Sequence, residues 1–198
     1  MTAAAVGIGA GVGLHLALGS SAMRPSPSLP ALHGEAVWPA GRRAAPGFVL
    51  PDQGGRLVSL AGERGRTVVL AFMDPVCKQE CPIEGRVLGF AQRQVAPAQR
   101  AVVLIVSVNP GATGAEARAA TRKWDISGET HWLLGGQAQL ARVWRTYDIT
   151  VLPSTHDIVH STAVYLIDRR GFERVGLIAP FPGPFVADDL RELAREPA

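Results

Sequence analysis

The sequence predicts an α/β fold in which a central mixed β-sheet carries helices on both faces. Two observations predict it: buried apolar runs alternate with amphipathic segments between residues 66 and 147, and a second pair of apolar runs precedes a last amphipathic segment near the carboxyl end. Unbroken runs of β-branched and apolar residues are typical of strands covered on both faces. A length of 198 residues with 47% apolar content suits one such domain with an appendage.

The chain becomes regular at Pro46. A Pro-Asp-Gln-Gly-Gly turn between residues 48–50 and 56–60 predicts an N-terminal β-hairpin. The apolar run 67–73 predicts a central buried strand over 66–73. The later elements expected in chain order are a helix over 83–95, a strand over 101–108, a helix over 115–124, a short strand over 131–134, a helix over 137–147, a loop over 148–160, a strand over 162–167, a turn at 168–171, a strand over 172–179 and a helix over 185–195. This order is that of a thioredoxin-like fold.

The N-terminal part has a different composition. Residues 1–22 contain no Lys, Arg, Asp or Glu, and their length suits a membrane anchor or a signal-like segment. Five glycines and the lack of basic residues weaken this interpretation, and a disordered terminus is the alternative. Residues 23–45 contain four prolines with several Ser and Ala, which predicts a linker. We therefore expect an anchor over 1–22, a linker over 23–45 and an extracytoplasmic domain over 46–198.

The charge balance excludes one class of partner. The 20 basic and 17 acidic residues nearly cancel, and the basic residues are scattered along the chain. A nucleic-acid-binding protein is expected to gather its basic residues in a stripe or patch. We therefore expect no nucleic-acid partner.

The most informative motif holds the chain's only two cysteines, Cys77 and Cys81, directly after the strand predicted over 66–73. A spacing of four places both sulfurs on one face of a helix or turn. Pro82 fits a first helical position, and the start of a helix favours thiolates. We therefore expect nucleophilic, partly exposed thiols that can form a disulfide. A purely structural bridge explains them poorly, because so short a loop gains only about 2 kcal/mol.

Three chemistries suit these thiols. A dithiol oxidoreductase usually has Cys-x-x-Cys, one residue shorter than the spacing here. A peroxidase of the peroxiredoxin kind is expected to have Thr three residues before its cysteine, where this chain has Asp74. A Cu(I) site needs soft thiolates, helped by an imidazole. His160 can supply that imidazole if the strand predicted over 162–167 lies beside the strand over 66–73.

The other four histidines are weaker candidates. His156 lies in the predicted loop and is a spare ligand candidate, whereas His131 begins a short strand and is expected to be structural. His33 lies in the linker and His15 in the apolar segment, and neither has a predicted partner. His160 is therefore the imidazole on which the copper hypothesis rests.

With these residues in place, the chain resembles the Sco/SenC family of thioredoxin-like copper chaperones over residues 46–196. The segment 77–82 matches Cys-x-x-x-Cys-Pro, and His160 leads into Tyr-Leu-Ile-Asp-Arg-Arg-Gly at 165–171. The resemblance implies a copper site, for Cu(I) and also Cu(II), with Cys77, Cys81 and His160 as ligands. It implies copper delivery to the cytochrome c oxidase subunit that carries the Cu(A) centre, and membrane attachment through the N-terminal segment.

Three positions depart from the family pattern. Lys78 stands where a proline often follows the first cysteine, and Asn109 stands where Asp is common. Val159 replaces an Asp that commonly precedes the histidine, so Asp157 is the candidate for that supporting role. The donor atoms are all kept. A thiol–disulfide oxidoreductase that keeps the acceptor's cysteines reduced, with Cys77 and Cys81 as its redox pair and a thiol–disulfide reductant as its partner, is the rival function.

Overall fold

The computed structural model describes residues 1–2, 32–152 and 158–197. Their centre is a six-stranded mixed sheet with the order β1-β10-β9-β4-β5-β6. The strands are β1 (Ala36–Val37), β2 (Val49–Pro51), β3 (Leu57–Ser59), β4 (Val68–Met73), β5 (Val102–Ser107), β6 (Thr130–Leu133), β7 (Val151–Leu152), β8 (Val159–His160), β9 (Ala163–Ile167) and β10 (Glu173–Ile178). The helices are α1 (Glu80–Arg93), α2 (Gly114–Lys123), α3 (Gln137–Thr146) and α4 (Gly183–Arg195), with 3₁₀ turns at Leu60–Glu63 and Pro97–Gln99. The predicted mixed sheet and N-terminal hairpin (β2–β3) are confirmed.

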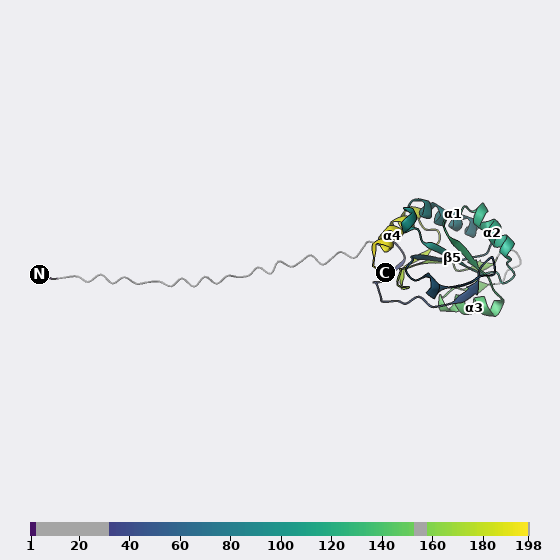
Figure 1. The fold of residues 1–198 in the computed structure, drawn as a ribbon, viewed down its shortest axis with the longest axis horizontal. Helices are drawn as coiled ribbons and strands as arrows, with labels where there is room; N and C mark the ends of the chain where they lie inside the picture. Colours follow the sequence, from purple (N-terminus) through teal and green to yellow (C-terminus); the bar gives the residue numbers. More distant parts are fainter. Residues whose placement is uncertain (3–31, 153–157, 198) are drawn as a thin grey trace.

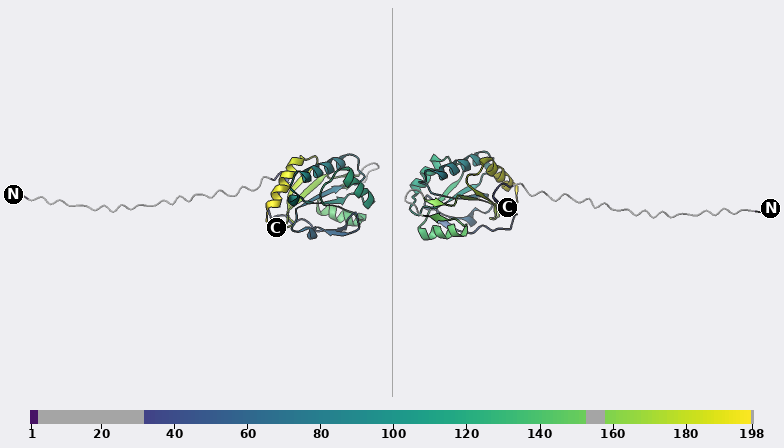
Figure 2. Two further views of the ribbon diagram at one scale, coloured as in Figure 1. Left: turned by 45° about the horizontal axis from the view of Figure 1, so that its top comes forward. Right: turned by 180° about the vertical axis from the view of Figure 1, so that it is seen from behind.

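Helices and a hairpin cover both faces of the sheet, as the apolar runs in its strands predict. Helices α1, α2 and α4 lie on one face, and α3 with the β2–β3 hairpin lies on the other (Figures 1 and 2). Every residue of β4 is at most 1% exposed. Alternate side chains of a strand point to opposite faces, so β4 fills both cores. Val69, Ala71 and Met73 belong to the core under α1, and Val68, Leu70 and Phe72 belong to the core over α3.

The pairing of β4 determines where the predicted site can form. β4 pairs in parallel with β5 and antiparallel with β9, with Ala71 opposite Val164. The carboxyl end of β4 and the amino end of β9 therefore lie at the same end of the sheet. The cysteines follow β4 and His160 precedes β9. The strand predicted over 162–167 therefore lies beside the strand predicted over 66–73, which is the arrangement that the copper hypothesis requires of His160.

The ordered domain begins earlier than the sequence pattern indicates. Ala36 and Val37 pair with β10 as strand β1, and Ala45 donates a backbone hydrogen bond to the Gly171 carbonyl at 3.0 Å. Residues 36–45 thus run beside β10, with β1 as the edge strand of the sheet, although Pro46 was the expected start. A strand of two residues shows no periodicity. Its pairing with β10 is supported by the Arg174 Nε–H, which donates to the Trp38 carbonyl, and by the Glu35 carboxylate, which accepts from the Ile178 N–H. The remaining part of the linker, 23–31, lies outside the described residues, as does most of the expected anchor.

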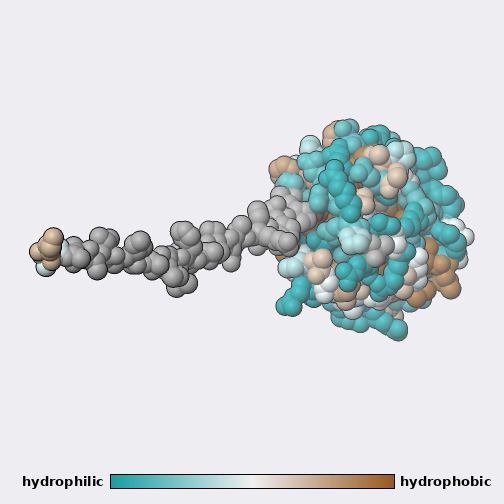
Figure 3. All heavy atoms as spheres, turned by 60° about the vertical axis from the view of Figure 1, so that its left-hand side comes forward, coloured by the Kyte–Doolittle hydropathy of each residue, from teal (hydrophilic) through white to brown (hydrophobic). Residues whose placement is uncertain are grey.

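Two local expectations also change. Helix α1 begins at Glu80, so Pro82 occupies its third position rather than its first. Proline is tolerated there because the first-turn N–H groups have no helical acceptor. The predicted loop over 148–160 contains a short antiparallel pair, β7–β8, in which Val151 faces His160. The face of the domain seen in Figure 3 is mostly hydrophilic, and no helix in the described part of the chain combines the length and apolar character needed to cross a bilayer.

Candidate functional site

The segment that carries the cysteines is held by Asp74, the residue directly after β4. Asp74 is 3% exposed. Its carboxylate accepts hydrogen bonds from the Val76 backbone N–H (3.2 Å) and the Asn109 side-chain amide (3.1 Å). Its backbone carbonyl accepts from the N–H of Cys77 at 3.1 Å. Three hydrogen bonds to Asp74 therefore hold the turn that carries Cys77.

The two sulfurs lie in different environments and are not joined by a disulfide in this structure. Cys77 precedes helix α1 and is partly exposed, as predicted, whereas Cys81 lies in the first turn of α1 and is 0% exposed. A hydrogen bond with Cys77 and then burial raise the pKa of the Cys81 thiol. The expectation of nucleophilic, partly exposed thiols is therefore wrong for Cys81, because the hydrogen bond with Cys77 and burial both favour its protonated form.

His160 is distant from the two cysteines in the sequence but lies beside them in the fold. Its Nε2 lies 3.7 Å from the Cys81 Sγ, across a separation of 79 residues. Its Nδ1 lies 2.9 Å from the backbone carbonyl of Ser161. A carbonyl can only accept, so Nδ1 carries the proton and the lone pair of Nε2 faces the thiol when the ring is neutral. The Ser161 carbonyl thus orients the ring, and Asp157 lies outside the described residues.

The three predicted donors are therefore neighbours at one end of the sheet. The 3.7 Å contact joins Cys81 to His160, and a hydrogen bond joins Cys81 to Cys77. Across residues 32–152 and 158–197, however, no three His, Cys, Asp or Glu side chains form a closed group that could already hold a metal ion. The arrangement is a buried thiol in contact with a half-buried imidazole, with a second, more accessible thiol beside it.

One residue near the thiols was missed by the sequence reasoning. Glu84 lies one turn after Cys81 in α1 and is 3% exposed. Among the described residues its two carboxylate oxygens have no hydrogen-bond partner. Burial, then the negative charges of Cys77 and Glu80, raise the pKa of Glu84 well above its usual range. Glu84 stands three residues after Cys81, which places both on the same face of the predicted helix. That spacing was the sequence signal that could have identified Glu84.

The other described histidines have structural partners. His131 is buried, with Nδ1 3.2 Å from the Asp52 carboxylate and Nε2 3.1 Å from the Glu129 carboxylate, which agrees with the structural role expected for it. His33, expected to have no partner, instead has its Nδ1 2.8 Å from Asp189 and stacks on the Phe185 ring at 4.6 Å. His15 and His156 lie outside the described residues.

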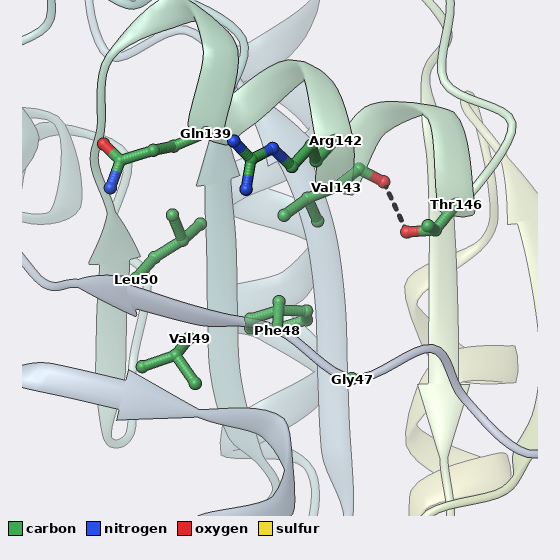
Figure 4. A pocket seen from close by; sticks show the side chains of 8 residues that line it. All are labelled: Gly47, Phe48, Val49, Leu50, Gln139, Arg142, Val143 and Thr146. Carbon is green, nitrogen blue, oxygen red and sulfur yellow. Dashed lines mark hydrogen bonds between the residues drawn. The ribbon is translucent and has the colours of Figure 1, made fainter.

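Two cavities help to place the site. One of about 600 Å³ opens beside His160, with Ser161, Tyr165 and Ile178 among its lining residues. Another of about 250 Å³ lies between β2 and α3, where Figure 4 shows Arg142 and Gln139 above Phe48 and Leu50. None of the three predicted donors lines that second cavity. Only the first gives a partner molecule access to the imidazole.

The fold and the site together define a thioredoxin-like domain that gathers two cysteines and a histidine at one end of its sheet. The SCO1/SenC family model matches residues 39–192, which is most of the chain. The chain therefore belongs to the SCO1/SenC family. No curated protein matches it.

Solved structures share the fold. Bradyrhizobium japonicum ScoI with copper bound is 23% identical, with a TM-score of 0.66 over 76% of this chain and 99% of that one. A SCO1/SenC family lipoprotein from Bacillus anthracis is 20% identical, with a TM-score of 0.71 over 81% of this chain and 100% of that one. BsSco, described as a Sco-family cytochrome c oxidase assembly protein with a disulfide switch, is 16% identical, with a TM-score of 0.68 over 82% of this chain and 100% of that one. These likenesses confirm the thioredoxin-like fold predicted from the order of the elements.

Proposed function

We propose that this protein is an extracytoplasmic copper chaperone that delivers copper to the Cu(A) site of cytochrome c oxidase, with Cys77, Cys81 and His160 as the copper ligands. The observation that carries the proposal is the 3.7 Å contact between the Cys81 sulfur and the His160 Nε2. Membership of the SCO1/SenC family supports it. Two proteins of the same fold support it further, since one holds copper and another is described as an oxidase assembly protein.

The donor set has the chemistry that this cargo requires. Thiolate and imidazole are the protein ligands that select Cu(I) over harder cations. The tautomer fixed by the Ser161 carbonyl leaves Nε2 of His160 free of a proton and directed at Cys81. Cys81 and Cys77 give up their protons when they bind the metal, so copper loading releases acid. The cavity beside His160 gives an acceptor protein access for ligand exchange.

Redox state and copper loading are coupled in this arrangement. Oxidation of Cys77 and Cys81 to a disulfide removes two of the three donors, so the oxidised protein releases its copper. A thiol–disulfide reductant is therefore a second expected partner, because it restores the two thiols.

We keep a thiol–disulfide oxidoreductase as the second candidate function because the two sulfurs are unequally exposed. Cys77 is partly exposed and Cys81 is fully buried. In a reductase that keeps the oxidase's cysteines reduced, the accessible sulfur attacks the partner and the buried one resolves the mixed disulfide. The disulfide switch described for BsSco favours such chemistry in this fold.

The location belongs to the same proposal. We infer that residues 1–22 attach the chain to a membrane and that the linker which follows them lets the domain reach its acceptor on the extracytoplasmic side. The apolar composition of residues 1–22 supports this, and a relative of the same fold is a lipoprotein. No nucleic-acid partner is part of the proposal.

The decisive experiment measures the Cu(I) affinity of the reduced, full chain by competition with a chromophoric Cu(I) chelator. We expect His160→Ala to weaken binding by about 100-fold or more, because even a residue that only supports a ligand costs 10–100-fold. His33→Ala is the matched control, since this histidine packs against Asp189 and Phe185. Equal affinities for His160→Ala and the wild type would remove the basis for copper carriage.

The reductase candidate needs a separate test. Cys81→Ser leaves Cys77 without its resolving thiol, so a reductase with this substitution should accumulate a mixed disulfide with its protein substrate. Cys77→Ser is the control and should trap none, because it lacks the accessible sulfur. A Cys81→Ser chain that traps no partner under conditions in which the wild type reduces one argues against this function.

A further inference from the structure

Four large apolar side chains are exposed around the start of helix α4. Ile178 lies at the end of β10, Phe185 lies in the first turn of α4, and Ile83 and Phe90 lie on the neighbouring helix α1. Each is between 40% and 56% exposed. We call these four residues the α1–α4 patch. Contiguous exposed apolar patches on a soluble domain mark contacts with a protein, a ligand or a membrane.

The members of the patch are joined through the connection between β10 and α4. Helices α1 and α4 lie side by side on one face of the sheet (Figure 1). A Cβ built at Gly183, the first residue of α4, would lie 2.7 Å from the Phe90 ring. Ile83 lines a small cavity of about 20 Å³ together with residues 179–181. The connection thus packs on both patch residues of α1.

The connection has a backbone that suits an apolar environment. Three of its residues are prolines, which have no N–H donor: Pro180, Pro182 and Pro184. The Ile178 N–H donates to the Glu35 carboxylate and the Ala179 N–H to the Thr162 carbonyl, each at 3.0 Å. The sequence from 175 to 187 contains no charged side chain. Contact with lipid is costly for charges and for unpaired N–H groups, and this segment presents few of either.

The chain that leads to the proposed anchor reaches the domain at this patch. The His33 ring stacks on the Phe185 ring at 4.6 Å, and the His33 N–H donates to the Asp189 carboxylate at 3.0 Å. Glu35 accepts the Ile178 N–H. A chain from residue 22 to residue 32 spans at most about 35 Å. If residues 1–22 are in a membrane, that membrane is the surface which the chain itself brings closest to the patch.

We propose that the α1–α4 patch contacts the bilayer surface when residues 1–22 are attached to the membrane. The inference rests on the location part of the proposed function. Insertion at the interface removes the four apolar side chains from water, which is favourable. Ile178 also lines the cavity beside His160, so this contact places that cavity next to the bilayer. A partner protein held in the same membrane can then reach the imidazole.

The test uses tryptophan reporters in the full chain, reconstituted in phosphatidylcholine vesicles with or without bromine on the upper part of the acyl chains. Bromine quenches indole emission on contact. We expect Phe185→Trp and Ile83→Trp to lose more emission in the brominated vesicles than the wild type does, because an inserted apolar face lies about 5–10 Å deep. The loss should persist at high salt, since the contact is apolar. Quenching that disappears at high salt overturns the apolar contact.

Leu57→Trp is the matched control. Leu57 is 71% exposed on the β2–β3 hairpin, which covers the opposite face of the sheet from α1 and α4. Its reporter should lose no more emission than the wild type. The comparison separates contact at the patch from general proximity of the domain to the vesicle.

The outcomes separate this proposal from the proposed function. If the chain binds the vesicles but both patch reporters are quenched no more than Leu57→Trp, the patch does not contact lipid and this proposal alone fails. Patch reporters shielded from acrylamide but not quenched by bromine show that protein covers the patch, which also overturns it. A full chain that does not bind the vesicles overturns this proposal together with the proposed membrane attachment.

Discussion

Asn109 donates a hydrogen bond from its side-chain amide to the carboxylate of Asp74 over 3.1 Å, and this bond joins the segments that follow β4 and β5. The same Asp74 oxygen accepts the Val76 N–H, so the bond also supports the turn that leads to Cys77. An amide at position 109 supplies a donor at every pH, whereas a carboxylate supplies one only when it is protonated.

This relationship predicts the effect of Asn109→Asp. Two facing carboxylates repel each other, and the lost hydrogen bond to a charged group adds to the cost, so we expect a loss of about 1–3 kcal/mol in the free energy of unfolding at pH 7. At pH 4 a proton on the new side chain restores the donor, and the loss should shrink. Urea unfolding at the two pH values measures it. A loss that is the same at both would show that the amide serves only as packing.

Helix α1, which carries Cys81, is packed too closely for a side chain at Gly89. A Cβ built there would lie 1.9 Å from the Asp125 carbonyl oxygen, which is backbone and cannot turn aside. Ala is normally favoured over Gly in a helix by about 1 kcal/mol. We expect Gly89→Ala to reverse that preference and to destabilise the protein by about 3 kcal/mol or more, at the upper end for overpacking.

Gly47→Ala is the control for this prediction. A Cβ at Gly47 would meet no atom within 4 Å, so the substitution should leave stability unchanged or raise it by up to about 1 kcal/mol. Urea or thermal unfolding compares the two variants. A Gly89→Ala protein as stable as Gly47→Ala would mean that the loop at residue 125 can move away from α1.

The sequence predicted those strands of the sheet that contain a clear run of apolar residues. β4 and β5 are unbroken apolar runs, and the structure buries them on both faces. β1 and the β7–β8 pair were missed because strands of two residues show no alternation. β1 pairs with the distant β10, whereas β7 and β8 pair with each other across a short connection. Pattern reasoning therefore succeeds where a run of buried side chains marks an element, and it fails where an element is too short to contain such a run.

Some features of the candidate site were also predicted from the sequence, and others were not. The proximity of Cys81 and His160 was predicted, because strand adjacency follows from the fold class. The burial of Cys81 was not predicted, since its exposure depends on the tilt of α1 rather than on its place in the motif. Glu84 was missed because a single acid in an amphipathic helix resembles a solvent-facing residue. The Asp189 partner of His33 lies 156 residues away, beyond any local signal.

Asp189 makes the stability of the domain depend on pH. It is 0% exposed, and burial raises its pKa to about 6, although hydrogen bonds from His33 oppose that rise. A raised pKa gives stability that is complete below the unfolded pKa of about 3.9 and is lost as the pH rises through 6. The shift of about 2 units corresponds to roughly 3 kcal/mol.

Asp189→Asn removes this dependence. We expect the free energy of unfolding of the wild type to fall relative to that of the variant, by about 3 kcal/mol, as the pH rises from 3.5 to 7. Asp188→Asn is the control, because its side chain is 56% exposed and pairs only with Arg191 among the described residues. Parallel stability curves for the wild type and Asp189→Asn would show that the buried carboxyl does not titrate in this range.

The raised pKa of Cys81 makes copper binding depend on pH. The copper affinity should rise with pH, whereas the stability that Asp189 contributes falls. A thiol must lose its proton to bind the metal, and each proton displaced raises the apparent affinity about tenfold per pH unit. We therefore expect the Cu(I) affinity of the reduced chain to rise at least about 100-fold between pH 6 and 8, in chelator competitions corrected for the chelator's own protonation. Cys81→Ser supplies no such proton, so its binding should be weaker and should rise less steeply. An affinity that does not change with pH in the wild type would therefore mean that copper is held without this sulfur, and the contact between Cys81 and His160 would need a purely redox explanation.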